Sequence, residues 1–208
     1  MTNVEKNFII KDGVLIKYIG KEKNVVIPNG VTSIGENAFL DCKALESITI
    51  PDSVTSIGKY AFFACKALKN ITIPNSVTYI GEHAFAFCVK IISIAIPDSV
   101  TSIRKYTFYR CESLTSITIP DHITSIGNYA FYMCESLTSI TIPDHITYIG
   151  IGAFCGCESL TNITIPDSVT FIGNHTFYKC ENLTNVIAPD NVTIKDYIFP
   201  CNCTVKYK

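Results

Sequence analysis

The sequence predicts one elongated domain, a β-rich α/β solenoid of 23-residue coils, and three observations lead to this class. Proline recurs at one constant interval, and the residues between the prolines repeat one apolar pattern. The first stretch of the chain does not repeat and the last repeat is shortened, as the capped ends of a solenoid require. A fixed period in the twenties is typical of coils that stack on one another. The prolines are Pro28, Pro51, Pro74, Pro97, Pro120, Pro143, Pro166 and Pro189.

Each repeat is expected to hold two short strands and one helical turn. In residues 47–50 and their equivalents, alternate residues are apolar, which predicts a half-buried strand. The proline ends this strand because it has no N–H to donate. Residues 54–57 predict a second short strand, and residues 60–65 predict one α or 3₁₀ turn. The apolar positions, given for one repeat, are Val54, Ile57, Ala61, Phe62, Cys65, Leu68, Ile71 and Ile73.

Two further positions are expected to shape the corners of each coil. Every repeat proline is followed by Asp or Asn, whose side chain can accept backbone N–H bonds in a turn. Gly58 and its equivalents are expected to turn the chain after the second strand. Arg104 is the one exception at this position among the complete repeats.

The N-terminal residues 1–27 are expected to cap the open end of the solenoid. Two β-prone runs, 8–10 and 14–18, flank Asp12-Gly13, and Asp-Gly is a strong hairpin signal. The hairpin should lie over the first coil and shield its apolar face.

Residues 28–188 are expected to form seven complete repeats, and residues 189–208 a shortened eighth repeat with a C-terminal cap. Within this cap, residues 192–196 have lost one position and the glycine. Residues 199–203 replace the helical turn, and residues 205–208 are expected to form a polar-ended tail.

Composition argues against several classes of protein. The net charge of −1 gives no electrostatic basis for binding nucleic acid or an anionic membrane. No apolar run approaches the ~20 residues that span a bilayer. The first ten residues lack the basic and apolar regions of a signal peptide, which leaves a cytoplasmic protein or one whose leader has been removed.

The run L-x-x-I-x-I-P-x-x-V-T-x-I-G-x-x-A-F-x-x-C, seen at residues 137–157 with Ile146 at the valine position, resembles the BspA-like (Treponema-type) leucine-rich repeat. The resemblance covers about residues 25–199, and the segment FIIKDGVLIKY resembles the cap of that family. It implies a right-handed leucine-rich-repeat superhelix with a parallel strand ladder. It also implies a secreted or cell-surface protein linked to adhesion, with no enzymatic constellation and no cofactor.

The ten cysteines raise the possibilities of disulfides and zinc, and the repeat argues against both. A column of in-register side chains neither converges on a metal nor offers disulfide geometry. The column is therefore expected to remain reduced and buried. Cys155, Cys201 and Cys203 lie off the column and are the expected reactive thiols. The column members are Cys42, Cys65, Cys88, Cys111, Cys134, Cys157 and Cys180.

Two Asp-His pairs, Asp121-His122 and Asp144-His145, stand one coil apart beside the strand end that Asp98 also marks. They could hold a metal or respond to pH. The alternative is an exposed polar corner, because serine takes the histidine position in neighbouring repeats. No metal site is assigned on this basis.

Two other columns admit a structural or a functional interpretation. The glutamates are expected to form a solvated ridge. This ridge either orients a binding partner or is a solvated surface without a role in binding. The aromatic side chains are expected to pack around the turn, or to form an adhesive edge, since tyrosine offers contact area at low entropy cost. The columns comprise Glu112, Glu135, Glu158 and Glu181, and Tyr60, Phe63, Tyr106, Tyr109, Tyr129, Tyr132 and Tyr178.

The outward residues of the strand ladder are the main candidate binding site. Short hydroxyls and amides make a flat strip without a deep pocket, which suits a protein surface better than a small molecule. The strip is expected to be continuous over the middle repeats, and weak binding there could be multiplied by avidity. Its residues are Asn70, Thr72, Ser93, Ser116, Thr118, Ser139, Thr141, Asn162 and Thr164.

Three classes of function remain after these observations. The first is a non-enzymatic scaffold that binds a protein partner. The second is a structural or self-associating solenoid, either monomeric or weakly associating. The third is an enzyme, which the sequence does not favour, because no catalytic spacing, phosphate loop or paired acids are found that the repeat itself does not explain.

Overall fold

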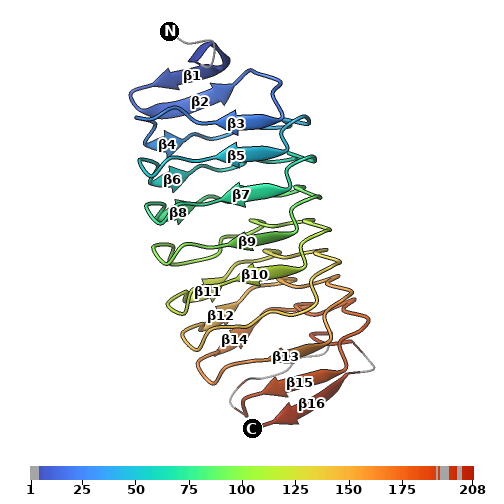
Figure 1. Ribbon diagram of the computed structural model, residues 1–208. Helices are drawn as coiled ribbons and strands as arrows, with labels where there is room; N and C mark the ends of the chain where they lie inside the picture. The colour runs from blue at the N-terminus through green and yellow to red at the C-terminus, as the bar shows by residue number, and fades with distance from the viewer. Residues whose placement is uncertain (1–4, 191, 193–196, 201–202) are drawn as a thin grey trace.

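The computed structural model describes residues 5–190, 192, 197–200 and 203–208. Coils stack along one axis with the two ends of the chain at opposite ends of the stack (Figure 1). The solenoid and its parallel strands are therefore confirmed. The expected α/β class is wrong, because the 3₁₀ segment Glu5–Asn7 is the one helical element in the described part of the chain.

Two ladders of parallel strands run along the solenoid, and equivalent residues of successive coils are in register, so that Ile48 pairs with Ile71 and Ile34 with Ile57. The first ladder contains β3 (Asn24–Val26), β5 (Ser47–Thr49), β7 (Asn70–Thr72), β9 (Ser93–Ala95), β10 (Ser116–Thr118), β13 (Asn162–Thr164), β15 (Asn185–Ala188) and β16 (Thr204–Tyr207). The second ladder contains β4 (Ser33–Ile34), β6 (Ser56–Ile57), β8 (Tyr79–Ile80), β11 (Ser125–Ile126), β12 (Tyr148–Ile149) and β14 (Phe171–Ile172).

The segment expected to form a helical turn is a series of tight turns instead. Tyr60 and Ala64 have φ angles of 56° and 58°, which a right-handed helical turn does not contain. The N–H groups of Tyr60 and Phe62 donate to the carbonyl oxygens of Glu82 and Ala84 in the next coil, at 3.0 and 2.8 Å. These donors connect coils, so they are not used in bonds within a helix, and the turn side becomes a third ladder.

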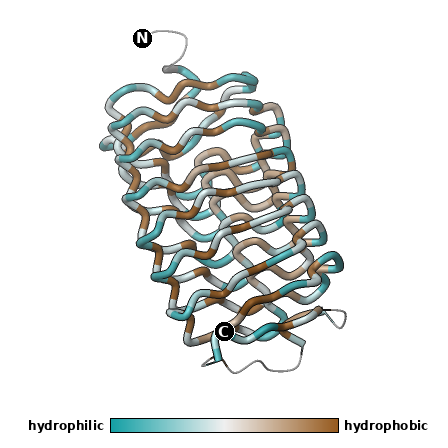
Figure 2. Tube along the Cα trace, turned by 60° about the horizontal axis from the view of Figure 1, so that its bottom comes forward, coloured by the Kyte–Doolittle hydropathy of each residue, from teal (hydrophilic) through white to brown (hydrophobic). Residues whose placement is uncertain are grey.

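One phenylalanine from each coil forms the centre of the core. The rings are fully buried and stack on one another with centroids 5.0 to 5.6 Å apart. Phe199 continues the stack beyond Phe177 at 5.2 Å. Hydrophobic stretches recur at equivalent places in successive coils (Figure 2). The column consists of Phe39, Phe62, Phe85, Phe108, Phe131, Phe154 and Phe177.

The repeated glycine permits close stacking and does not turn the chain. Gly58 and Gly150 have no positive φ, but a Cβ at Gly150 would lie 2.5 Å from the backbone nitrogen of Asn128 in the preceding coil. Each coil thus approaches its neighbour too closely for a side chain. The expected role of these glycines is corrected accordingly.

Arg104 takes the glycine position at a place where both strand ladders are interrupted. Strands β7 and β9 are not paired, and β8 ends its sheet. Ile103 forms only an isolated bridge to Ile126 on its other side. Turn-side bonds such as Phe85 N–H to the oxygen of Thr107, at 2.9 Å, still cross this place. We call the contact between the coils of β7–β8 and of β9–Ile103 the Arg104 junction.

Strands close both ends of the solenoid. At the N-terminus, the expected hairpin is present as β1 (Phe8–Lys11) and β2 (Val14–Tyr18), and β2 pairs with β4. At the C-terminus, the segment expected to be a polar tail is β16, which pairs with β15. Lys208 forms an ion pair with Asp167 at 2.9 Å. Residues 193–196 and 201–202, about which expectations were stated, lie outside the described residues.

The positive φ angles of the turn ladder lead to a stability prediction. Lys179 is exposed and has a φ of 59°, and Gly156 takes its place one coil earlier with a φ of 75°. Lys179→Gly is expected to raise the free energy of unfolding by about 1 kcal/mol, because glycine adopts this conformation without steric cost. Denaturant unfolding followed by circular dichroism measures the change.

Lys66→Gly is the matched control, since Lys66 is also an exposed lysine of the turn side but has no positive φ. It should lower the free energy of unfolding by about 0.5–1 kcal/mol. Equal effects of the two substitutions would contradict the assignment of strain to Lys179.

Candidate protein-binding face

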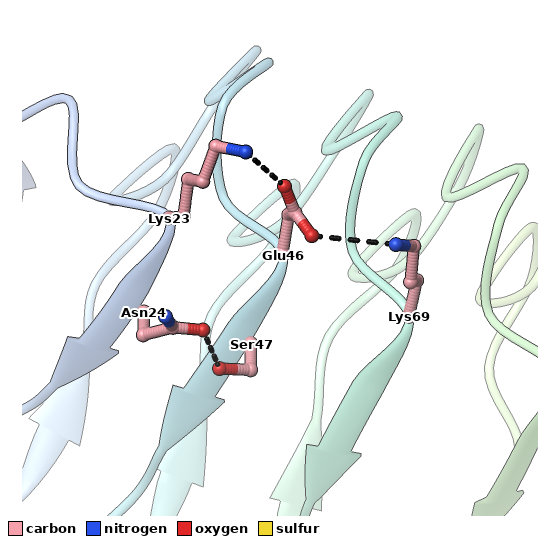
Figure 3. A network of polar contacts seen from close by, with 5 residues as sticks. All are labelled: Lys23, Asn24, Glu46, Ser47 and Lys69. Carbon is pink, nitrogen blue, oxygen red and sulfur yellow. Dashed lines mark hydrogen bonds and ion pairs between the residues drawn. The ribbon is translucent and has the colours of Figure 1, made fainter.

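The outward side chains of the first ladder form a polar surface, which we call the ladder face. All nine residues predicted for it are exposed, and each pair flanks an inward isoleucine. Polar side chains also bond along the ladder. The Ser47 hydroxyl donates to Asn24 Oδ1 at 2.6 Å (Figure 3), and Asn185 Nδ2 donates to Asn162 Oδ1 at 3.1 Å. These bonds orient amides and hydroxyls in rows along the solenoid.

The N-terminal part of the ladder face carries a row of alternating charges. Glu46 lies between Lys23 and Lys69, with ion pairs of 2.9 and 3.3 Å (Figure 3). The hydrogen bond from Lys23 and then that from Lys69 lower the pKa of Glu46. The hydrogen bond to Glu46 raises the pKa of Lys23. All three groups are solvated, so the row orders surface charges and contributes little to stability.

The C-terminal part of the ladder face is acidic. Residues 111–190 contain eight acidic residues and one lysine, Lys179. Each of four successive repeats has one glutamate before its outward strip and one aspartate directly after its proline. The acidic residues are Glu112, Glu135, Glu158 and Glu181, and Asp121, Asp144, Asp167 and Asp190. The face thus changes from mixed charge to negative charge up to residue 190, and Lys206 and Lys208 at the last strand add two positive charges, one of which pairs with Asp167.

The strip was expected to be continuous over the middle repeats, but its backbone pairing is interrupted there. Strand pairing stops between β7 and β9, and residues 139–141 form no strand. Ser139 and Thr141 are nevertheless exposed on either side of buried Ile140. The ladder face therefore keeps its alternation of side chains where it loses strand hydrogen bonds.

The corner histidine has a structural partner that the sequence did not indicate. His122 has a ring nitrogen 3.1 Å from the carbonyl oxygen of Val100. Ser53 and Ser76, at the same repeat position, donate to the equivalent carbonyls of the preceding coil at 2.7 Å. The histidine thus replaces a serine bond between coils. Among the described residues, no cluster of three His, Cys, Asp or Glu side chains could hold a metal.

The predicted aromatic edge is a stack of half-buried rings on the turn side. Tyr106 lies between His83 at 4.4 Å and Tyr129 at 5.1 Å, and Tyr109 stacks on Tyr132 at 4.9 Å. Burial lowers the pKa of His83 and raises those of Tyr106 and Tyr109. The ring faces are occupied by neighbouring rings, so mainly ring edges face solvent. His83 is a member of the stack that sequence reasoning missed, although it occupies the same repeat position as Tyr60 and Tyr106.

The buried cysteines of the column have a specific hydrogen-bonding role. Each thiol donates to the carbonyl oxygen of the core phenylalanine in the preceding coil. For Cys88 and Phe62 the distance is 3.1 Å. The nine cysteines within the described residues are free. The expected reactivity of Cys155 is not supported, because it is buried and burial raises its pKa. Burial also raises the pKa of Cys203, and Cys201 lies outside the described residues.

Comparison with known proteins agrees with this architecture. The profile of the family described as BspA type Leucine rich repeat region matches six copies, over residues 16–135 and 101–207. A comparison with curated proteins finds no match. Within the described residues, no helix is long and apolar enough to cross a membrane.

Solved structures with similar folds come from several bacteria. The Treponema pallidum leucine-rich repeat protein TpLRR is 27% identical, with a TM-score of 0.59 and coverage of 95% of this chain and 90% of that one. The pneumococcal vaccine antigen PcpA is 16% identical, with a TM-score of 0.52 and coverage of 91% and 63%. A leucine-rich cell surface protein of Faecalibacterium prausnitzii is 24% identical, with a TM-score of 0.48 and coverage of 96% and 92%. With the profile matching almost the whole repeat region, the chain belongs to the BspA-type leucine-rich repeat family.

Proposed function

We propose that this protein is a non-enzymatic scaffold that binds another protein through the ladder face. The observation that carries the proposal is the regular exposure of hydroxyl and amide side chains over the first ladder. Such a surface offers many modest hydrogen bonds over a large area, which suits a protein partner. Three pockets of about 250 to 310 Å³ lie beside the N-terminal hairpin and the second ladder, and none of the nine ladder-face residues lines them.

The charge distribution supports a partner with a basic surface. The outward strips of residues 111–190 carry acidic side chains at both ends and hydroxyls and amides between them. Complementary charge increases the rate of association and disfavours partners of the same sign. The proposed role is adhesion or recognition at a cell surface, which rests on family membership.

A second candidate is a self-associating solenoid without a separate partner. Strands β1 and β16 lie at the ends of their sheets, so each leaves one edge without a strand partner within the described chain. Free edges can pair with another chain. Sedimentation equilibrium over a hundredfold range of concentration distinguishes the two, because only self-association makes the mass depend on concentration.

The test of the proposed function uses Thr118 and Thr141, which are both exposed. The double substitution Thr118→Lys with Thr141→Lys places two positive charges in the acidic half of the ladder face. Binding to a partner captured with the full chain is expected to weaken tenfold or more, because the lysines repel a basic surface and remove two hydroxyls. Surface plasmon resonance measures the affinity, and circular dichroism should show an unchanged fold.

The control is the double substitution Tyr109→Ala with Tyr132→Ala on the aromatic edge. It should leave the affinity within about threefold of wild type, since these rings lie away from the ladder face. If the tyrosine variant abolishes binding and the lysine variant does not, the aromatic edge is the binding site and the proposal is wrong.

A further inference from the structure

Arg104 departs from the repeat at a position where a side chain is costly. The six equivalent positions hold glycine, and a Cβ there would lie within 3 Å of the neighbouring coil. At Arg104 both strand ladders are interrupted. Arg104 replaces the repeated glycine and coincides with lost strand pairing, and such a departure from the repeat is expected at a functional site. The glycines are Gly35, Gly58, Gly81, Gly127, Gly150 and Gly173.

A pocket of about 300 Å³ lies next to this residue, on the second-ladder side of the solenoid. The coil of Arg104 lies between the coils of β8 and β11 and carries no second-ladder strand (Figure 1). Most of its polar lining consists of hydrogen-bond donors. The residues that matter here are Ser102, Arg104, Lys105, Ser125, Asn128 and Tyr148.

The side chains of Ser102, Arg104 and Ser125 donate no hydrogen bond to another described residue, whereas Lys105 and Tyr148 are already paired within the protein. The guanidinium of Arg104 lies 4.6 Å from the centre of the Tyr79 ring, and no ion pair or hydrogen bond joins it to a described residue. In the two coils before β8, the equivalent hydroxyls of Ser33 and Ser56 form a hydrogen bond with each other at 2.7 Å. The equivalent hydroxyls of Ser102 and Ser125 have no such bond in the described chain.

The amide of Asn128 also favours a ligand that accepts hydrogen bonds. Its Oδ1 already accepts the Tyr148 hydroxyl at 3.1 Å and the Ile151 N–H at 3.0 Å. Its Nδ2 therefore remains as the donating group. The arrangement of donors around the pocket is complementary to an oxyanion.

The free guanidinium of Arg104 favours a planar oxyanion. Lys105 and Lys59 both pair with Glu82, at 3.4 and 3.6 Å, and Glu82 also lines the pocket. Arg104 has no carboxylate partner among the described residues. A planar carboxylate matches the guanidinium in its two-pronged geometry.

We propose that this pocket binds the carboxylate of a small polar ligand, such as a sugar acid or the end of a peptide. Arg104 binds the carboxylate through two N–H donors, and the Tyr79 ring holds the guanidinium plane. Ser102, Ser125 and Asn128 donate to the remaining oxygen lone pairs and to ligand hydroxyls. This site lies on the second ladder, so it is separate from the ladder face.

The test follows backbone amide resonances of the full-length protein by NMR during titration with D-glucuronate. Resonances of Ser102, Arg104 and Asn128 should shift with a dissociation constant of about 1 mM, typical of one charge-assisted site in water. N-acetylglycine is the peptide-end probe, and the relative affinities of the two probes show which source of carboxylate fits better. Glucose and N-acetylglycinamide, the uncharged counterparts, should cause no saturable shift.

Arg104→Gln should weaken binding of both carboxylates at least tenfold. Arg110→Gln is the matched control, because Arg110 pairs with Glu112 at 3.3 Å and does not line the pocket. It should bind as wild type does. Circular dichroism establishes that both variants fold. If Arg104→Gln does not fold, the Arg104 side-chain Nε–Hε resonance of the wild-type protein is followed during the glucuronate titration. A saturable shift of this resonance supports the proposal, and no shift contradicts it.

Three results would overturn the proposal. One is saturable binding of glucose equal to that of glucuronate, and another is unchanged affinity in Arg104→Gln. The third is inorganic phosphate binding more tightly than either carboxylate, which would reject the carboxylate assignment. None of these results bears on the Thr118 and Thr141 test, because that test concerns the other ladder.

Discussion

Raising the pH from 8 to 10 is expected to remove about 8 kcal/mol from the free energy of unfolding, through the linkage between proton release and folding. The cause is the column of buried thiols, each of which must keep its proton in the folded protein. Burial raises the pKa of Cys180 to about 12. Burial raises the pKa values of the other core thiols well above their ordinary value, with the interaction with the adjacent Cys42 thiol as the larger cause for Cys65. The other thiols are Cys65, Cys88, Cys111, Cys134 and Cys157.

The sign follows from comparing the two states. Below the ordinary thiol pKa of about 9, which we take for the unfolded chain, both states hold the proton and the thiols do not affect the pH dependence. Above it, the unfolded chain releases protons that the folded chain retains, so each thiol costs about 1.4 kcal/mol per pH unit. Six thiols at pH 10 approach the whole stability of a typical domain, roughly 5–15 kcal/mol. Denaturant unfolding at pH 8, 9 and 10 measures the loss.

The matched control is Cys111→Ala, which removes one thiol from the middle of the column. It lowers stability at pH 8, because the core loses a sulfur atom and its bond to the Phe85 carbonyl, 3.2 Å long. Between pH 9 and 10, however, its loss of stability should be smaller than that of wild type by about one sixth. A wild-type loss that corresponds to a single thiol would mean that the column admits hydroxide or releases its protons in the folded state.

Gly150→Ala is expected to lower the free energy of unfolding by about 3 kcal/mol. The added Cβ would lie 2.5 Å from the Asn128 nitrogen and 2.6 Å from the Gly127 carbonyl carbon. Relief requires the two coils to separate, which weakens the 2.8 Å bond from Gly150 N–H to the Ile126 oxygen. Guanidinium unfolding followed by circular dichroism measures the effect.

Gly30→Ala is the control for the conformational part of this effect. A Cβ at Gly30 would have no atom within 4 Å, but its φ of 91° disfavours alanine. The control should cost only about 1 kcal/mol. If both substitutions cost the same, the glycines serve the chain conformation and not the close approach of coils.

The proposals for this protein concern two different sides of the solenoid. The ladder face offers area, rows of hydroxyls and a change of charge along the axis, as a protein partner requires. The pocket beside Arg104 offers one guanidinium and a few donors, as a small anion requires. Both sides depend on stacking, because a single coil provides neither a row nor a pocket wall.

Much of the fold could be predicted because the relevant signals lie within a few residues of one another. Alternation around Ile71 and its equivalents places side chains inside or outside a strand whatever the rest of the chain does. The turn signal at Asp12-Gly13 similarly determines a hairpin locally. The exposure of the nine ladder-face residues followed from the same alternation.

The conformation of the turn side could not be predicted in the same way. Residues 60–65 have the spacing of a helical turn, but the N–H groups of Tyr60, Phe62 and Ala64 bond to the next coil, and only the stacked structure provides those acceptors. The positive φ values of Tyr60 and Ala64 are a consequence of that arrangement. A cost of about 1 kcal/mol at such a residue is offset by bonds and ring contacts between coils.

The sequence by itself therefore determined the period, the family resemblance, the inward and outward positions of the strands and the hairpin that caps the chain. Only the tertiary structure decided the effects that depend on the distance between coils. These are the bond from each core thiol to a phenylalanine carbonyl, the crowding that requires Gly150, and the interrupted ladders and pocket at Arg104. Local signals specify where a side chain points, but the atoms that it meets come from another coil, a full repeat away along the chain.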